Sequence, residues 1–121
     1  MDIEQAVCDW LADLGETFTV TPLDLADRLP AIRVGRIGGQ VDQQSDQPTI
    51  DIQTYTVRDA DDPRSSLNLA NAVLDRFLGF PFMAGPVLVD EAHCSTGPTF
   101  IGYPDQTLSV VRAIYTLTIR R

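Results

Sequence analysis

The stretch that decides the fold is residues 107–120, TLSVVRAIYTLTIR, because its side chains alternate in character with a period of two. The apolar set is Val111, Ala113, Tyr115, Leu117 and Ile119, and the opposite set is Arg112, Ile114, Thr116, Thr118 and Arg120. Successive side chains of a β-strand point to opposite faces, so the pattern predicts a strand with one buried and one wet face. Such a strand is typical of an antiparallel sheet covered on one side.

Three further segments are predicted strands, namely residues 31–37, 49–57 and 86–95. The segment TIDIQTYTV at 49–57 is rich in β-branched and aromatic residues, as strands are. The first strand is expected to end at Gly38-Gly39 and to lead through a polar loop over 40–48 into the second strand. This arrangement predicts a hairpin with a long loop. A second long loop is expected over 95–106, which holds two prolines and two glycines and shows no periodicity.

Two helices are predicted from apolar stripes that recur every three or four residues. The stripe of the first helix, over 2–14, consists of Ile3, Val7, Trp10, Leu11 and Leu14. The stripe of the second consists of Ala70, Val73, Leu74 and Phe77. Asp62-Pro63 suits the start of the second helix, and Gly79 followed by Pro81 suits its end after Leu78.

The order of these elements is helix, strand, strand, helix, strand, strand. It predicts an α+β fold over residues 1–121, a single domain with one mostly antiparallel four-stranded sheet and two helices packed on one face. No apolar run approaches the roughly 18 residues that a membrane span requires. The acidic first residues also argue against a secretory signal.

The charge of the chain argues against nucleic-acid binding. The sequence contains 17 acidic residues, nine arginines and no lysine, which gives a formal net charge of −8. Contacts to phosphate supply most of the affinity of DNA-binding proteins, and they need a basic surface. We therefore do not expect this chain to bind DNA specifically.

The stretch IRVGRIGGQ at residues 32–40 could be taken for a phosphate-binding loop. A Walker loop requires G-x-x-x-x-G-K-[ST], and this sequence has no lysine. A dinucleotide-binding turn requires G-x-G-x-x-G between a strand and a helix, whereas this segment reads G-x-x-G-G and precedes a predicted strand. The glycines are better explained as the end of a strand.

The acidic run Asp59, Asp61 and Asp62 resembles the start of a calcium-binding loop. An EF-hand loop requires an oxygen ligand at its fifth position and glycine at its sixth, where this chain has Pro63 and Arg64. Negative charge is also favourable at a helix N-terminus. We therefore expect a structural role and no metal site.

Neither cysteine nor histidine predicts catalysis. Cys8 and Cys94 lie far apart without a C-x-x-C motif, so we expect two small thiols rather than a disulfide or a zinc site. His93 and Cys94 are neighbours on a predicted strand and would point to opposite faces. Glu91 and His93 share a face and could form a polar pair. We expect no catalytic residue, no cofactor and no metal ligand.

Five segments taken in order resemble a known family: IEQAVCDWLADL, RLPAIRVGRIGG, DQPTIDIQTY, LNLANAVLDRFL and YTLTIRR. The chain resembles, over nearly its whole length, the tail terminator proteins of long-tailed bacteriophages, especially those of actinobacterial phages. No single segment is diagnostic of the family. The similarity lies in their order and spacing, and neighbouring neck and tail-completion proteins share the same fold.

The resemblance implies a structural protein of the virion rather than an enzyme. Such proteins assemble in the host cytoplasm, close the growing tail tube as a ring, usually of six copies, and present the surface that joins the head. The implied partners are further copies of the chain, the tail tube protein and a head-completion or neck protein. DNA passes through the channel without specific binding, and an acidic lumen would suit that passage. The alternatives are another neck or tail-completion protein and, from a different class, a small enzyme or ligand-binding domain.

The ring leads to one hypothesis about individual residues. Contacts in a ring are head-to-tail, and we expect strand edges and the long loops to make them. Arginine suits ion pairs at interfaces, so Arg33 or Arg36 is expected to pair with an acid of the neighbouring subunit. Gln40 and Asp42, in the loop over 40–48, are expected at the same interface. The alternative is that both arginines lie on a solvated sheet face.

Overall fold

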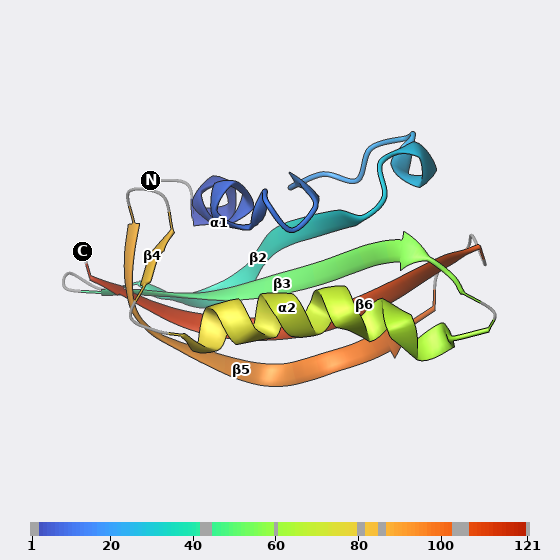
Figure 1. The fold of residues 1–121 in the computed structure, drawn as a ribbon. Coiled ribbons are helices and arrows are strands. Elements are labelled where there is room, and N and C mark those ends of the chain that lie inside the picture. Colours follow the sequence, from blue (N-terminus) through green and yellow to red (C-terminus); the bar gives the residue numbers. More distant parts are fainter. Residues whose placement is uncertain are drawn as a thin grey trace.

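A computed structural model describes residues 3–41, 45–59, 61–79, 82–84, 87–102 and 107–120. Two α-helices are present, α1 (Ile3–Leu11) and α2 (Leu67–Leu78), with short 3-10 turns η1 (Leu25–Asp27) and η2 (Pro63–Ser66). The strands are β1 (Glu16–Phe18), β2 (Ala31–Val41), β3 (Ser45–Val57), β4 (Phe82–Ala84), β5 (Val87–Ile101) and β6 (Leu108–Arg120). All six strands form one sheet in the order β1-β2-β3-β6-β5-β4 (Figure 1).

The predicted four-stranded sheet and its element order are wrong. The sheet has six strands and is mixed, because β1 pairs parallel with β2 while every other neighbouring pair is antiparallel. The two additional strands, β1 and β4, are three residues long. A segment of three residues cannot show a periodic pattern, and each becomes a strand only by pairing with the edge of a longer strand.

The two predicted loops are also wrong, because strands run into both of them. The pairing of β2 with β3 continues past Gly38 and Gly39 to Val41 opposite Asp46, and β5 extends to Ile101. Both extensions are polar or glycine-rich. Their backbone groups bond to an adjacent strand, so the strands persist without an alternating sequence.

The predicted helices lie close to the observed ones. The second helix ends at Leu78 as predicted, with Gly79 at its C-cap, and a 3-10 turn that begins at Pro63 precedes it. The first helix ends at Leu11 rather than residue 14. Asp62 makes no side-chain capping bond. No helix in the described ranges has the length and apolar character needed to cross a membrane.

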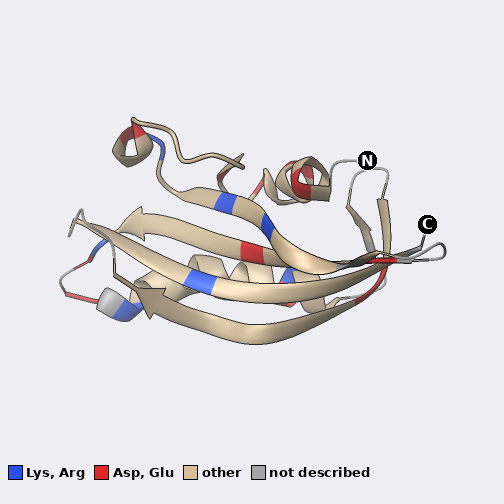
Figure 2. Ribbon diagram, turned by 180° about the vertical axis from the view of Figure 1, so that it is seen from behind, with Lys and Arg blue, Asp and Glu red and all other residues tan. Residues whose placement is uncertain are grey.

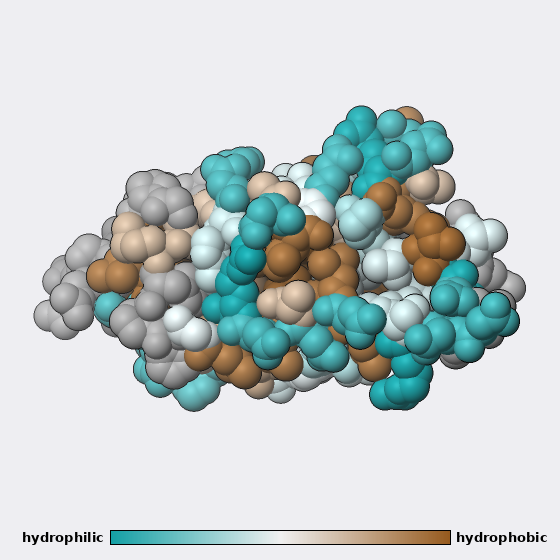
Figure 3. Space-filling model, in the orientation of Figure 1, coloured by the Kyte–Doolittle hydropathy of each residue, from teal (hydrophilic) through white to brown (hydrophobic). Residues whose placement is uncertain are grey.

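Both α-helices pack on the same face of the sheet and form the main core with it (Figure 1). The ring of Phe77 stacks on Tyr115 with centroids 4.2 Å apart, and Trp10 meets Phe77 edge-on at 5.1 Å. The alternation in β6 is confirmed, since Val111, Ala113, Tyr115, Leu117 and Ile119 are all buried. Between α1 and α2, hydrophobic side chains reach the surface (Figure 3).

The sheet curls around its helices. Helix α1 contacts β2 near one margin of the sheet and also β4 at the other margin, which a flat sheet of six strands would not allow. In the described part of the chain no α-helix lies on the opposite face of the sheet, which is called here the open face. At one end, a small second core that includes Tyr55 and Leu25 of η1 covers it.

Candidate functional site

The two margins of the sheet are only partly paired. Strand β1 pairs with β2 at Ala31–Arg33, and β4 pairs with β5 at Val87–Val89. Within the described ranges, residues 34–41 of β2 and 91–101 of β5 therefore have a partner strand on one side only. Strand edges of this kind present unpaired backbone N–H and C=O groups to other chains.

The two short strands block opposite ends of the sheet. The register places Arg33, beside β1, in line with Thr99 of β5. It places Val89, beside β4, in line with Val41 of β2 through Ile119 and Asp46. The β2 edge is therefore covered by β1 at the end of the sheet where the β5 edge is free. The β5 edge is covered by β4 at the end where the β2 edge is free.

A polar cluster lies in the middle of the open face. It is called here the Asp51 cluster and comprises Arg33, Asp51, Gln53, Tyr55 and Arg112. Arg112 Nε donates to Asp51 Oδ1 at 2.9 Å, and Gln53 Nε2 donates to Asp51 Oδ2 at 3.2 Å. The hydroxyl of Tyr55 donates to Gln53 Oε1 at 2.8 Å. These bonds fix the orientation of the Gln53 amide and connect β3 to β6.

The Asp51 cluster contains one arginine more than it has acids. The Asp51 side chain is only 9% exposed and is paired with Arg112, which is 39% exposed. Arg33 lies directly across from Gln53, on the side opposite Arg112. The Nε of Arg33 is buried and has no hydrogen-bond partner within the described part of the chain. A buried donor without an acceptor costs free energy, so this group is a candidate for an external ligand.

The structure separates the two arginines proposed for the subunit interface. Arg36 lies across from Ile50, whose side chain faces the helices, whereas Arg33 faces the open side. Both guanidinium nitrogens Nη1 and Nη2 of Arg36 bond to Asp46, at 3.2 and 3.0 Å, and its Nε bonds to the carbonyl of Gly38. Arg36 is therefore satisfied within its own chain.

Of the other two interface candidates, Gln40 and Asp42, only Gln40 lies within the described residues. Gln40 lies in β2 opposite Gln47 of β3, so its backbone belongs to the sheet and not to a loop. Asp42 lies outside the described residues. Whether any of the four residues contacts another subunit stays a prediction.

The thiols and the histidine form no reactive pair. Cys8 is buried, and Cys94 Sγ lies 3.3 Å from the carbonyl oxygen of Thr96. Burial raises the pKa of the Cys94 thiol, which lowers its thiolate fraction and hence its reactivity. His93 Nε2 lies 3.6 Å from Glu91 Oε1, and both side chains are largely exposed.

The acidic run before α2 forms a turn that is held by hydrogen bonds to the Asp59 side chain. Asp59 Oδ1 accepts hydrogen bonds from the backbone N–H groups of Asp61 and Asp62, at 2.9 and 3.3 Å. Such bonds stabilise turns. Across the ranges that the structure describes, no group of three His, Cys, Asp or Glu side chains is arranged to hold a metal ion.

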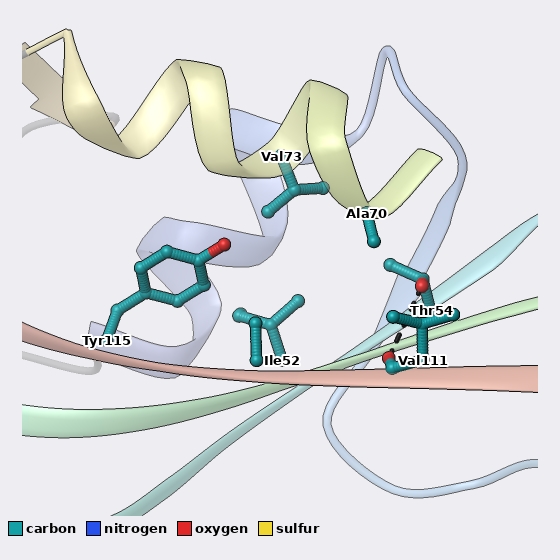
Figure 4. Close-up of a pocket in the computed structure, with 7 residues that line it drawn as sticks. Ile52, Thr54, Ala70, Val73, Val111 and Tyr115 are labelled. Carbon is teal, nitrogen blue, oxygen red and sulfur yellow. Dashed lines mark hydrogen bonds between the residues drawn. The ribbon is translucent and has the colours of Figure 1, made fainter. Parts of the chain in front are cut away.

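A small apolar gap lies between α2 and the sheet (Figure 4). Ile52, Val73 and Tyr115 line it, and the hydroxyl of Thr54 donates to the carbonyl oxygen of Val111 at 3.3 Å. The gap is too small to hold a water molecule. Burial raises the pKa of the Tyr115 phenol, so the hydroxyl stays protonated near neutral pH. This is a packing defect of the core and not a ligand site.

The acids are concentrated away from the middle of the open face. Of the fourteen acids in the described ranges, nine lie on the helices and the connecting segments and five on strands (Figure 2). In the centre of the open face, the single acid Asp51 is bound to Arg112 and flanked by Arg33. The centre of the open face is therefore not acidic.

Comparison with models of known protein families gave no match, and comparison with curated proteins gave none. Positions 51, 53 and 55 alternate along one strand, so the sequence already indicates that three members of the Asp51 cluster share a face. Arg33 and Arg112 join them only through the register with two other strands, which the sequence does not specify.

Proposed function

We propose that this chain is a structural protein of a phage virion that assembles into a ring and closes the end of the tail tube, as its resemblance to tail terminators implies. The observation that supports the proposal is the pair of free edges on β2 and β5. The two edges belong to different strands at opposite margins of one sheet, so joining them between copies is a head-to-tail contact. Contacts of this type generate closed rings when the rotation between subunits closes.

The strand directions favour such a joint. Strands β2, β3, β6 and β5 are antiparallel to their neighbours in turn, so β2 and β5 run in opposite directions. A rotation about an axis along the strands preserves these directions. The β5 edge of one copy would then meet the β2 edge of the next in antiparallel orientation, as strands pair within the sheet.

A mutation in the β5 edge tests this assembly. Thr96 is exposed and lies in the free part of β5, where a lysine would oppose edge-to-edge pairing through its charge and bulk. We expect the unaltered chain to form rings and cap tubes of tail tube protein, and Thr96→Lys to require about tenfold more protein for assembly. Light scattering after size-exclusion chromatography and negative-stain microscopy would measure both.

The matched control is Val57→Lys, which adds the same charge at an exposed position at the end of β3, within the sheet. It should assemble like the unaltered chain. An unaltered chain that stays monomeric and leaves tubes uncapped would refute the proposed function. Rings that bind a head connector but not tubes would assign the chain to the neck proteins instead.

A further inference from the structure

Arg33 has no acidic partner within the described part of its chain. Its Nε is buried and lacks an acceptor, while the two carboxylate oxygens of Asp51 are bonded to Arg112 and Gln53. The Gln53 oxygen in turn accepts the hydroxyl of Tyr55. The polar groups next to Arg33 on β3 are therefore committed to other bonds and leave its Nε without an acceptor.

Space for such an acceptor exists beside Arg33. Gly35 follows two residues later on the same strand and lies opposite Asp51. A Cβ atom added at Gly35 would meet no atom within 4 Å, and the same holds at Gly38. Arg33 is the last residue of β2 that pairs with β1, and past it β2 carries no side chain at Gly35 or Gly38. This leaves an approach for a side chain from another molecule on the side of Arg33 that faces away from β1.

The charge of the cluster indicates which group fits. Arg33 and Arg112 carry two positive charges, and Asp51 carries one negative charge, so one further negative charge would neutralise the cluster. A carboxylate carries that single charge and matches the paired N–H donors of a guanidinium group. A DNA phosphodiester also carries one charge, but a chain with a net charge of −8 repels DNA.

We propose that Arg33 binds a carboxylate side chain of a second copy of this chain. The proposal rests on the proposed ring, in which the next copy lies beside β2. A second copy offers many carboxylates, because the chain has 17 acids and exposes several of them, including Asp27, Asp61 and Asp75. Arg36 takes no part, since Asp46 already neutralises it.

The absence of lysine from the sequence permits a direct test. In the variant Arg33→Lys, the new amine is the only lysine side chain, and a carbodiimide joins it to a carboxylate only where the two are in contact. Rings would be assembled from a mixture of isotope-labelled and unlabelled Arg33→Lys protein and then treated. We expect cross-linked peptides that combine a labelled and an unlabelled chain, and mass spectrometry would identify the acid.

Arg64→Lys serves as the control, because Arg64 is exposed on η2 and lies outside the Asp51 cluster. It should give no specific cross-link between copies. Cross-links confined to single chains, or none, in rings of normal size would overturn the role of Arg33 and leave the ring intact. A wild-type chain that never assembles would overturn both proposals.

A second variant covers the case in which Arg33→Lys does not fold. Arg33→Gln keeps hydrogen-bond donors and removes the charge, and we expect it to raise the protein concentration for half-assembly about tenfold. Arg64→Gln should leave that concentration unchanged. Equal assembly of Arg33→Gln and the unaltered chain, at the same unfolding midpoint, would contradict the proposal.

Discussion

At the scale of single residues, Gly39 is the position where only glycine fits. Its φ is +113°, and a Cβ atom there would lie 2.1 Å from the carbonyl oxygen of Gln47 on β3. The neighbouring Gly38 has open space around it. The sequence predicted Gly38 and Gly39 at the end of a strand before a loop, whereas Gly39 lies within the paired strands β2 and β3.

The two glycines therefore predict unequal effects of the same substitution. Gly39→Ala should reduce the free energy of unfolding by about 1–3 kcal/mol, because it forces strain into the backbone and a clash with β3. Gly38→Ala should change it by less than about 1 kcal/mol. Urea denaturation would compare the two, and equal effects would show that the backbone at Gly39 does not have this conformation.

Asp51 is the residue that organises the open face. Asp51→Asn removes the charge that Arg112 neutralises and leaves that guanidinium group without its acid. We expect a loss of about 1–3 kcal/mol in the free energy of unfolding, the range typical of a disrupted charged hydrogen bond. The exposed Asp27→Asn is the matched control and should be nearly neutral. A neutral Asp51→Asn would show that the cluster does not support the fold.

At the scale of elements, Arg76 joins the two helices. It projects from α2 and donates to the Trp10 carbonyl at the end of α1, at 2.9 Å, and to both carboxylate oxygens of Asp13. The hydrogen bonds from Arg76 lower the pKa of the Asp13 carboxyl in the folded state. The stabilisation from this pair is therefore present above the unfolded pKa, near 3.8, and is lost as the pH falls through the lower folded value.

This linkage predicts a change in the pH dependence of stability. Between about pH 5 and about pH 3, the free energy of unfolding should decrease less steeply in Arg76→Gln than in the unaltered chain. The pair has already been removed in the variant, so its protonation no longer costs stability. Thermal unfolding across this range would measure the slope. Arg64→Gln should keep the original slope, and an unchanged slope in Arg76→Gln would contradict the role of the pair.

The elements that the sequence predicted well are those with a long periodic pattern. The apolar set of helix α2 spans about two helical turns, and that of strand β6 alternates from Val111 to Ile119; both elements were located from these sets. Strands β1 and β4 and the ends of β2 and β5 form because a neighbouring strand supplies hydrogen bonds. Such elements depend on tertiary contacts that no local window contains.

At the scale of the whole molecule, the sequence predicted that helices cover one face, but not the curl of the sheet or its strand order. Both depend on which distant strands pair. The candidate site shares this limit: Arg33, Gln53 and Arg112 come from three strands and meet only through the pairing of β2, β3 and β6. The free edges of β2 and β5 are defined by where β1 and β4 pair, and the sequence did not predict either of these short strands.

The central pairing of β3 with β6 also bears on how fast the chain folds. The hairpins β2–β3 and β5–β6 join neighbouring segments, whereas β3 and β6 pair residues as distant in sequence as Ser45 and Arg120. Closing so long a loop costs chain entropy before any contact compensates for it. We expect the docking of one hairpin against the other to be the slow step, with refolding on the millisecond-to-second timescale of sheets rich in non-local pairings. During that interval both margins of each hairpin are unpaired, which is when the chain is most exposed to aggregation.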